Sequence, residues 1–382
     1  MDITIQPGKL SGSITASPST SPAHRLLLCA AFADGVTTLL CPDTNRDIEA
    51  TVDCLNALGA DIIRNDEGYV IQPIKKSPKT ATLNCCESGS TLRFMLPIVG
   101  ALGVDAVFRM AGRLPQRPLS PLWEEMERMG CTLTRPTADT IRCRGKLLPG
   151  DYTIAGGVSS QYITGLSFAL PLIDGDTDLH VTGKLESKPY VTMTVRAKAL
   201  FGAPGTVSPG TVVVEGDWSN GAFFLAAKAL GNDIAVNNLN PDSPQGDRAA
   251  AELLPKLEEN ITIDASDIPD LVPILSIVAG AKRGATFTNI QRLRIKESDR
   301  VASTIAMIEA LGGRAESTEN TLTVYGTGYT GGTVDAQNDH RIAMSAAIAA
   351  TVCTQPVTVI GAEAVKKSYP KFWDEYKRLS QN

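Results

Sequence analysis

The segment from Arg294 to Arg300 carries more charge than the start of a helix needs. It reads Arg-Ile-Lys-Glu-Ser-Asp-Arg, so five of its seven residues are ionisable and three of these are cations. Residues 285–290 before it are predicted to form a strand, and residues 301–311 after it an amphipathic helix. Ser298 is predicted to cap this helix, and Asp299 suits the positive end of the helix dipole. Either the segment is a well-capped, solvated helix start, or its charges belong to a functional site.

Other cations favour the second interpretation. Cations occur at or beside several predicted helix starts, and two more lie in loops that contain proline. Because the chain is acidic overall, with a net charge of -5, these cations predict a local site for phosphate and carboxylate groups. A surface salt bridge is the alternative for each cation taken singly. The set is Arg25, Arg93, Lys296, Arg300 and Arg341 at helix starts, and Arg117 and Lys367 in loops.

Two carboxylates in different settings are candidates for acid–base chemistry. Asp270 precedes an apolar helix, whereas Glu297 lies between Lys296 and Arg300. Carboxyl groups in different surroundings can hold different pKa values and take different roles. A plain acidic residue at a helix start is the alternative for Asp270. His340 is either catalytic or a hydrogen-bonding residue near a helix cap.

Composition limits the class of protein. A chain of 382 residues predicts two domains, and 43% hydrophobic with 20% charged residues is typical of a soluble globular protein. The net charge gives no support for a nucleic-acid partner. The first residues show no signal peptide and no stretch is long enough to span a membrane, so a cytoplasmic location is expected. The eight cysteines and three histidines form no metal-ligand pattern, and no P-loop or dinucleotide fingerprint is present.

A repeated plan organises the whole chain. A polar helix start followed by an apolar run of helical length occurs six times, and a second helix type that ends at a glycine alternates with it. Short strands rich in Val, Ile and Thr follow, so the pattern predicts an α/β fold built from six repeats of strands and two helices. Helices apolar on all sides are expected to be buried, in two helix cores with their amino ends available to anions. The first-type segments are residues 21–34, 87–102, 159–172, 217–230, 269–281 and 338–352, and the glycines are Gly59, Gly130, Gly202 and Gly312.

Ten motifs in order along the chain resemble the 5-enolpyruvylshikimate-3-phosphate synthase family. The resemblance implies two inverse α/β-barrel domains, each of three βαβαββ units, with an active-site cleft between the domains. It places residues 1–16 and 216–382 in domain I and residues 17–215 in domain II. The motifs lie at residues 87–94, 117–118, 159–161, 187–190, 215–219, 241–247, 268–271, 296–300, 338–341 and 367–370.

The resemblance also implies a reaction. The enolpyruvyl group of phosphoenolpyruvate moves to the 5-hydroxyl of shikimate 3-phosphate and phosphate is released, a step of the shikimate pathway to chorismate and aromatic amino acids. No cofactor, metal, nucleic acid or membrane is implied, and the expected form is a monomer.

Site residues follow from the same resemblance. Asp270, Glu297 and Lys367 are implied to be catalytic, with Asp270 as the base for the hydroxyl proton and Glu297 acting at the methylene carbon. The implied substrate contacts are Thr20, Ser21, Arg25, Gly89, Arg117, Ser159, Ser160, Gln161, Ser187, Tyr190, Arg292, Lys296, Arg300, His340 and Arg341.

One departure from the family pattern lies at position 20. The family carries Lys in its first phosphate-binding loop, whereas this chain has Thr20. A hydroxyl brings no charge, so weak binding of phosphoenolpyruvate and of its analogue glyphosate is expected. The substitution leaves open a low-activity or repurposed relative that binds a phosphorylated ligand. UDP-N-acetylglucosamine enolpyruvyl transferase is a further alternative, although residues 112–118 lack the loop cysteine of that enzyme.

Overall fold

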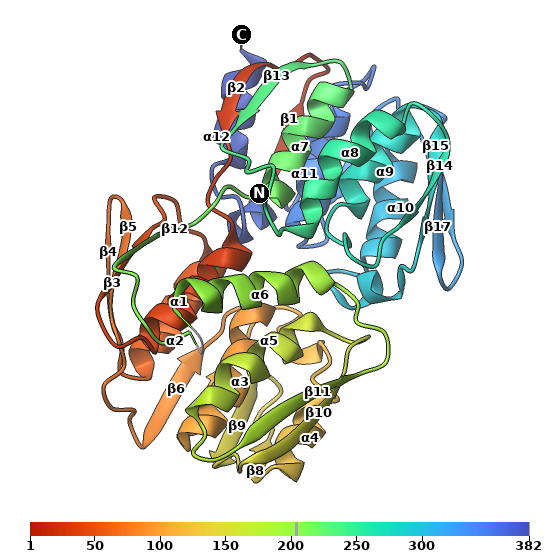
Figure 1. Ribbon diagram of the computed structural model, residues 1–382. Coiled ribbons are helices and arrows are strands. Elements are labelled where there is room, and N and C mark those ends of the chain that lie inside the picture. The colour runs from red at the N-terminus through yellow and green to blue at the C-terminus, as the bar shows by residue number, and fades with distance from the viewer. Residues whose placement is uncertain (203–204, 382) are drawn as a thin grey trace. The chain divides into compact units, whose positions relative to one another are not determined.

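A computed structural model describes residues 1–202 and 205–381. The chain divides into two compact units, of which unit 1 comprises Met1–Ser17 with Glu215–Asn382 and unit 2 comprises Pro18–Val214. Helices and strands alternate along both units (Figure 1), and the predicted α/β class is confirmed. Within the described ranges, no helix has both the length and the apolar character that crossing a membrane requires.

The middle repeat of unit 2 is a complete βαβαββ unit. Its elements are β6 (Thr80–Asn84), α3 (Gly89–Leu102), β7 (Asp105–Arg109), α4 (Leu122–Arg128), β8 (Cys131–Thr134) and β9 (Thr140–Gly145). Strands β6 and β7 are parallel, and the hairpin β8–β9 adds antiparallel to β7, giving the order β6-β7-β9-β8. The short helix η1 (Leu114–Gln116) lies between β7 and α4.

The first repeat of unit 2 is completed by a strand from the end of that unit. It contains α1 (Thr20–Ala31), β3 (Thr37–Leu40), α2 (Arg46–Ala57), β4 (Asp61–Asn65) and β5 (Gly68–Gln72). Strand β12 (Thr211–Val213) pairs parallel to β3 and gives the order β12-β3-β5-β4. The strand order is therefore the same as in the middle repeat.

The third repeat of unit 2 corrects the prediction of six complete βαβαββ units. It has β10 (Gly150–Ala155), α5 (Ser160–Ala169), η2 (Leu170–Leu172), β11 (Thr177–Thr182) and α6 (Lys188–Leu200), and β10 and β11 form a sheet of two strands. Between α6 and β12, the described residues 201–202 and 205–210 contain no strand.

Unit 1 contains one complete repeat. It comprises β14 (Ile261–Asp264), α9 (Val272–Ala281), β15 (Gly284–Thr288), η4 (Gln291–Ile295), α10 (Arg300–Ala310), β16 (Arg314–Ser317) and β17 (Thr321–Tyr325), with the order β14-β15-β17-β16.

The other two repeats of unit 1 each use a strand from the amino terminus. Strand β1 (Asp2–Ile5) pairs antiparallel to β19 (Val357–Ile360), which is parallel to β18 (Gly332–Asp335). Strand β2 (Ser11–Thr15) pairs parallel to β13 (Asp233–Asn237) in a sheet of two strands. The helices are α7 (Trp218–Ala229), η3 (Gly246–Ala249), α8 (Ala250–Lys256), α11 (His340–Ala349), η5 (Ala362–Lys367) and α12 (Phe372–Ser380).

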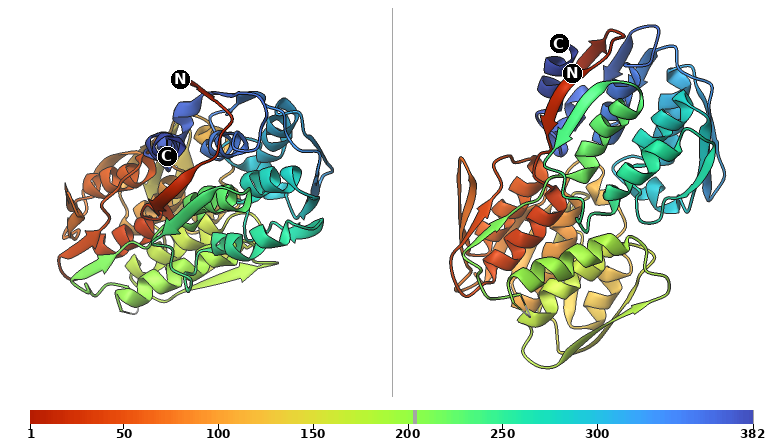
Figure 2. Two further views of the ribbon diagram at one scale, coloured as in Figure 1. Left: turned by 90° about the horizontal axis from the view of Figure 1, so that it is seen from above. Right: turned by 45° about the horizontal axis from the view of Figure 1, so that its top comes forward.

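Apolar helices form the interior of each unit. Nine of the ten residues of α9 and all ten of α11 are buried in the core of unit 1, and α3 is buried along almost its whole length in unit 2. The strands lie outside these helices in all three views (Figures 1 and 2). The predicted burial of the first-type helices is confirmed. The four glycines predicted to follow the second-type helices all have positive φ, so those predicted left-handed ends are also confirmed.

Candidate active site

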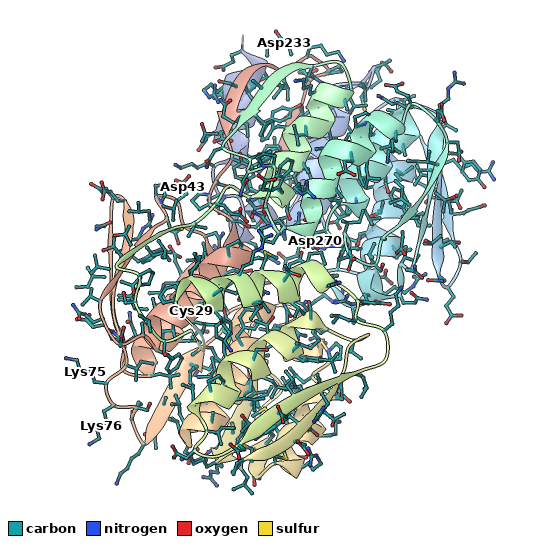
Figure 3. All side chains as sticks on the ribbon, in the orientation of Figure 1. Cys29, Asp43, Lys75, Lys76, Asp233 and Asp270 are labelled. Atoms are coloured by element: carbon teal, nitrogen blue, oxygen red, sulfur yellow. The ribbon has the colours of Figure 1, made fainter. Side chains whose placement is uncertain are left out.

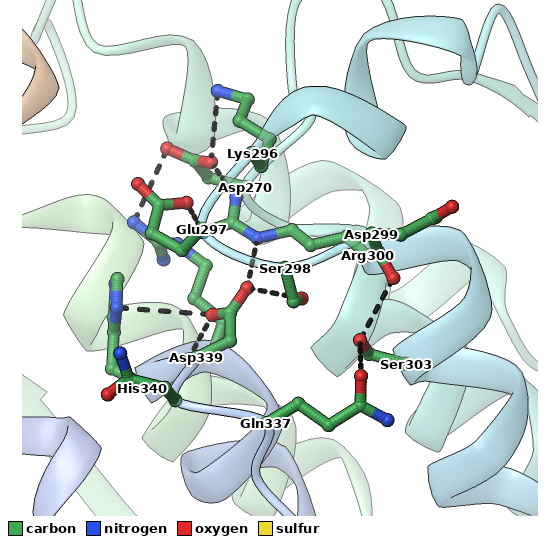
Figure 4. A network of polar contacts seen from close by, with 12 residues as sticks. Asp270, Lys296, Glu297, Ser298, Asp299, Arg300, Ser303, Gln337, Asp339 and His340 are labelled. Atoms are coloured by element: carbon green, nitrogen blue, oxygen red, sulfur yellow. Dashed lines mark hydrogen bonds and ion pairs between the residues drawn. The ribbon is translucent and has the colours of Figure 1, made fainter. Parts of the chain in front are cut away.

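The buried guanidinium of Arg300 is the centre of a charge network in unit 1 (Figure 4). Arg300 is the first residue of α10 and is 1% exposed. Its Nε donates to Asp339 Oδ2 over 2.9 Å, its Nη2 donates to Glu297 Oε2 over 2.6 Å, and its Nη1 donates to Asp270 Oδ1. One cation therefore orients three carboxylates that come from three separate segments of the chain.

Asp270 is held as a carboxylate by the cations around it. It directly precedes the apolar residues that lead into α9, and it is labelled in Figure 3. Arg341 Nη2 lies 3.4 Å from Asp270 Oδ2, and Lys296 Nζ lies 3.6 Å from Asp270 Oδ1. Burial acts to raise the pKa of Asp270, but Arg341, Lys296 and Arg300 together hold it well below its usual range. In this arrangement Asp270 is charged and accepts a proton weakly.

The pKa of Lys296 depends on the same neighbours. Burial lowers the pKa of its amine, with Arg300 and Arg292 acting in the same direction and Asp270 opposing them. Arg292, in η4, is thus close enough to act on Lys296 through its charge. The structure brings the predicted residues Arg292, Lys296 and Asp270 together.

Asp339 is the third carboxylate on Arg300, and sequence reasoning missed it. It is fully buried and its Oδ2 also accepts from the Ser298 hydroxyl over 2.9 Å. The prediction that Ser298 caps α10 is therefore wrong. Asp299 is the cap, because its Oδ1 accepts from the backbone N–H of Val301 and of Ala302, each over 3.1 Å. A signal for Asp339 existed in the sequence, since it directly precedes the predicted residues His340 and Arg341 in the Asn-Asp-His-Arg motif.

His340 and Lys367 flank this network. His340 Nδ1 lies 3.9 Å from Asp339 Oδ1, and burial together with Arg341 lowers the pKa of His340 to about 4, so the ring is neutral near pH 7. Lys367, in η5, is 8% exposed and donates from Nζ to the Asn338 carbonyl over 2.7 Å. The carbonyl contact places the Lys367 amine beside the start of α11, where Arg341 also lies.

A second carboxylate that the sequence interpretation left without a role is Asp247 in η3. It is 3% exposed and accepts a hydrogen bond from the Ser219 hydroxyl. Burial and the charge of Asp270 raise the pKa of Asp247 to about 7, while Arg341 acts against the rise. Two buried carboxyl groups that influence each other therefore differ widely in acidity.

In unit 2, two guanidinium groups converge on the start of α3. A Cβ atom at Gly89 would lie 2.5 Å from Arg93 Nη1 and 2.7 Å from Arg117 Nη1, so a larger residue there would displace these guanidinium groups. Arg93 donates to Gln161 Oε1 over 3.1 Å, and Gln161 Nε2 donates to Ser90 Oγ over 2.9 Å. The predicted Gly89, Arg117 and Gln161 are thus brought together, with Arg93 as the residue that links α3 to α5.

The guanidinium of Arg25 in unit 2 forms hydrogen bonds with oxygen atoms of the protein itself. Arg25 is 2% exposed and its guanidinium donates to the Ser21 carbonyl over 2.7 Å, the Tyr190 carbonyl over 3.0 Å and the Thr194 hydroxyl over 2.9 Å. Burial lowers the pKa of Arg25 to about 10. Arg25 therefore joins the start of α1 to α6 and fixes Ser21 and Tyr190 relative to each other.

The remaining predicted residues of unit 2 lie at helix starts. Thr20 is the first residue of α1, and its Oγ1 accepts from Asn45 Nδ2 over 2.7 Å. Ser159 caps α5 by accepting from the Gln161 N–H over 3.3 Å, and Ser160 is the buried first residue of that helix. Ser187 precedes α6 with a φ of 54° and is 1% exposed.

The described side chains contain no group of three or more His, Cys, Asp or Glu residues arranged to hold a metal ion. The chemistry that the residues themselves offer is acid–base transfer by carboxylates and binding of anions by guanidinium and ammonium groups.

Comparisons with known proteins identify the family of this chain. A family model described as EPSP synthase (3-phosphoshikimate 1-carboxyvinyltransferase) matches residues 5–376. A relative from Clostridium kluyveri named 3-phosphoshikimate 1-carboxyvinyltransferase is 36% identical, with 99% of this chain and 97% of that protein covered. A relative of the same name from Clostridioides difficile is 35% identical with the same coverage.

Solved structures show the same fold. EPSP synthase from Acinetobacter baumannii superimposes with a TM-score of 0.81 at 22% identity, covering 99% of this chain and 98% of that one. The enolpyruvyl transferase NikO from Streptomyces tendae gives a TM-score of 0.71 at 17% identity, covering 99% and 96%. Because the family model spans nearly the whole sequence and the named relatives exceed 30% identity over their full length, the predicted resemblance is confirmed: the chain belongs to the EPSP synthase (3-phosphoshikimate 1-carboxyvinyltransferase) family of transferases.

Proposed function

We propose that this protein transfers the enolpyruvyl group of phosphoenolpyruvate to the 5-hydroxyl of shikimate 3-phosphate and releases phosphate, in the cytoplasm. The observation that carries the proposal is the Arg300 network, in which one buried guanidinium holds two carboxylates that remain accessible. Asp270 is 15% and Glu297 26% exposed at the side chain, whereas Arg300 is 1% exposed. The identity of the two substrates is inferred from the family to which the chain belongs.

In the proposed reaction, Glu297 gives a proton to the methylene carbon of phosphoenolpyruvate. The central carbon gains cationic character and the 5-hydroxyl attacks it while Asp270 takes the hydroxyl proton. The tetrahedral intermediate then expels phosphate, and a proton returns from the methyl carbon to Glu297. Cations that are already oriented stabilise the charges that move in these steps.

Substrate anions are expected to activate Asp270. Its pKa is held down by Arg341, Lys296 and Arg300. We assign Arg300, Arg341 and Lys367 to the phosphoenolpyruvate anion, and Lys296 with Arg292 to shikimate 3-phosphate. When a phosphate or carboxylate shares these cations, their hold on Asp270 weakens and its pKa rises toward a value suited to a base.

Unit 2 is assigned the remaining substrate contacts. Gly89, Arg117 and Gln161 are proposed for phosphoenolpyruvate, supported by the two guanidinium groups over Gly89. Ser159, Ser160 and Ser187 are proposed for shikimate 3-phosphate. Ser21, Tyr190, Arg25 and Thr20 complete the proposed contacts in unit 2, with Arg25 supporting the contacts of Ser21 and Tyr190. His340, the last proposed contact, lies in unit 1.

A steady-state assay of phosphate release with both substrates tests the proposal, with mass spectrometry of the product. Shikimate 3-phosphate should be required, and UDP-N-acetylglucosamine should not replace it. Equal phosphate release with UDP-N-acetylglucosamine as the acceptor would contradict the assignment. Binding of shikimate 3-phosphate without formation of any product would also contradict it.

A further inference from the structure

Strand β11 has an edge that the complete repeats cover with a hairpin. In the complete sheets, the strand equivalent to β11 pairs antiparallel with the second strand of a hairpin, as β7 does with β9 and β15 with β17. In the part of the chain that the structure describes, β11 pairs only with β10. One row of backbone N–H and C=O groups along Thr177–Thr182 is therefore offered to another strand.

The helix after β11 also lacks its usual cover. In the other repeats of unit 2, the second helix contacts the first hairpin strand, as α2 does with β4 and α4 with β8. Helix α6 has no such strand and exposes apolar side chains, with Val195 at 62% and Leu200 at 57% exposure. On β11, Val181 is 38% exposed. The missing hairpin therefore leaves both a backbone edge and an apolar helix surface.

The sequence of β11 is complementary to itself in one antiparallel register. If Leu179 lies opposite Leu179 of a second copy, Asp178 lies opposite the second copy's His180, and His180 opposite its Asp178. Both pairs point to the outer face of the sheet, because side chains alternate along a strand. Leu179 and Val181 then share the inner face, where Leu179 already packs against the core of unit 2.

We propose that β11 pairs antiparallel with β11 of a second copy of this chain, in a twofold dimer. The resulting sheet has the order β10-β11-β11-β10, so its number of strands and its central antiparallel pair match the complete repeats. The two α6 helices lie on the same face of this sheet on either side of the twofold axis, and their exposed apolar side chains cover it. This dimer replaces the monomer that the family resemblance implied.

Strand β13 has a similar open edge but lacks the features that favour pairing. Its sheet also has two strands. The helix that follows it, α8, exposes Glu252 and Lys256 rather than apolar side chains. Antiparallel self-pairing about Ala235 would set Asp233 opposite Asn237, with no opposite charge. The edge of β13 therefore serves as the matched control.

Relatives have residues that this chain lacks. The alignment with the Clostridium kluyveri protein extends over 412 positions, more than the 382 residues of this chain. That relative therefore has residues at positions where this chain has none. A shortened chain with unpaired edges is the situation in which a second copy can supply the absent strands.

Cross-linking tests the register. Only residue 179 faces itself in the proposed pair, so Leu179→Cys should form a covalent dimer when the full chain is treated with diamide, a thiol oxidant that is itself reduced. Thr177→Cys, whose opposite residue is Val181, should cross-link no more than the parent, which controls for the eight native cysteines. Equal cross-linking of both variants, or none with Leu179→Cys, would overturn the register.

Sedimentation equilibrium tests the dimer itself. The parent should approach twice the mass of one chain as its concentration rises. Val181→Lys places a charge on the inner face of the sheet in both copies, next to the β11–β11 pair. It should raise the dissociation constant of the dimer about tenfold or more. Ala235→Lys on β13 should leave it unchanged. A parent that stays monomeric at its highest soluble concentration, or equal weakening by both variants, would refute the proposal, whereas enolpyruvyl transfer is measured separately and does not depend on it.

Discussion

Thr20→Lys is the substitution that most directly probes the departure of this chain from its family. Thr20 opens α1, and its hydroxyl accepts a hydrogen bond of 2.7 Å from Asn45 Nδ2. Asn45 in turn caps α2, accepting through Oδ1 from the N–H groups of Asp47 and Ile48 over 3.1 and 3.0 Å. Position 20 is thus tied to the start of a second helix through one residue.

The expected gain and cost act on different quantities. A lysine would add a charge-assisted hydrogen bond to a substrate anion, worth about 1.5–3 kcal/mol, or roughly 10- to 150-fold in kcat/KM. Loss of the hydroxyl removes the acceptor for Asn45 Nδ2 and should lower the free energy of unfolding by about 0.5–1.5 kcal/mol. The variant is therefore expected to be faster and slightly less stable than the parent.

Thr20→Met separates charge from side-chain length, since methionine fills similar space without a cation. Steady-state phosphate release gives kcat/KM for the parent and both variants, and glyphosate inhibition gives a second measure of the same anion contact. Thr20→Lys should be faster and more sensitive to glyphosate than either of the others. If Thr20→Lys and Thr20→Met had the same kcat/KM, the lost charge at position 20 would not limit this enzyme and the reasoning would be wrong.

Three further outcomes are expected. Asp270→Asn and Glu297→Gln should each lower kcat by about 10²- to 10⁴-fold in the phosphate-release assay, and a loss confined to KM would argue against acid–base roles. Arg300→Met leaves three carboxylates without their shared cation, so urea denaturation should show a loss of about 3–5 kcal/mol, and a loss below about 1 kcal/mol would contradict its central position. Burial, with a smaller contribution from Arg25, lowers the pKa of His24 to about 3. Below pH 6.5 the unfolded chain therefore binds more protons than the folded chain. As the pH is lowered from 7 to 5, the free energy of unfolding should decrease by about 2 kcal/mol on account of His24. His24→Gln should remove that part of the pH dependence, with exposed His180→Gln as its control, and unchanged pH dependence in the first variant would refute the buried-histidine argument.

Helix positions were predictable because each carries a local signal. The apolar run of residues 269–281 predicts a buried helix, and α9 occupies Val272–Ala281. The glycine that follows a helix was equally informative, since Gly202 with a φ of 68° ends the helix at Leu200 as expected. In both cases the backbone conformation depends on residues that are neighbours in sequence.

Features that depend on distant pairing were not predictable. Nothing near Ser298 in the sequence indicates that its hydroxyl is taken by Asp339, 41 residues away, which leaves the capping role to Asp299. The family resemblance implied six complete βαβαββ units, whereas only three of the six repeats are complete in the described residues. The repeats were recognised by their helices, which carry no signal for the strands. Family resemblance supplied the roles of the site residues, and the geometry adds the dependence of Asp270 on three cations.

The pairing of β1 with a strand near the carboxyl end of the chain has a consequence for synthesis on the ribosome. Strand β12 closes unit 2, so that unit has all its strands once residue 213 has emerged. Strand β1 pairs with β19, whose last residue is Ile360. At about 5–20 residues per second, the amino-terminal strand waits on the order of tens of seconds for its partner. Unit 2 therefore folds first, in the middle of a chain whose two ends are still unpaired.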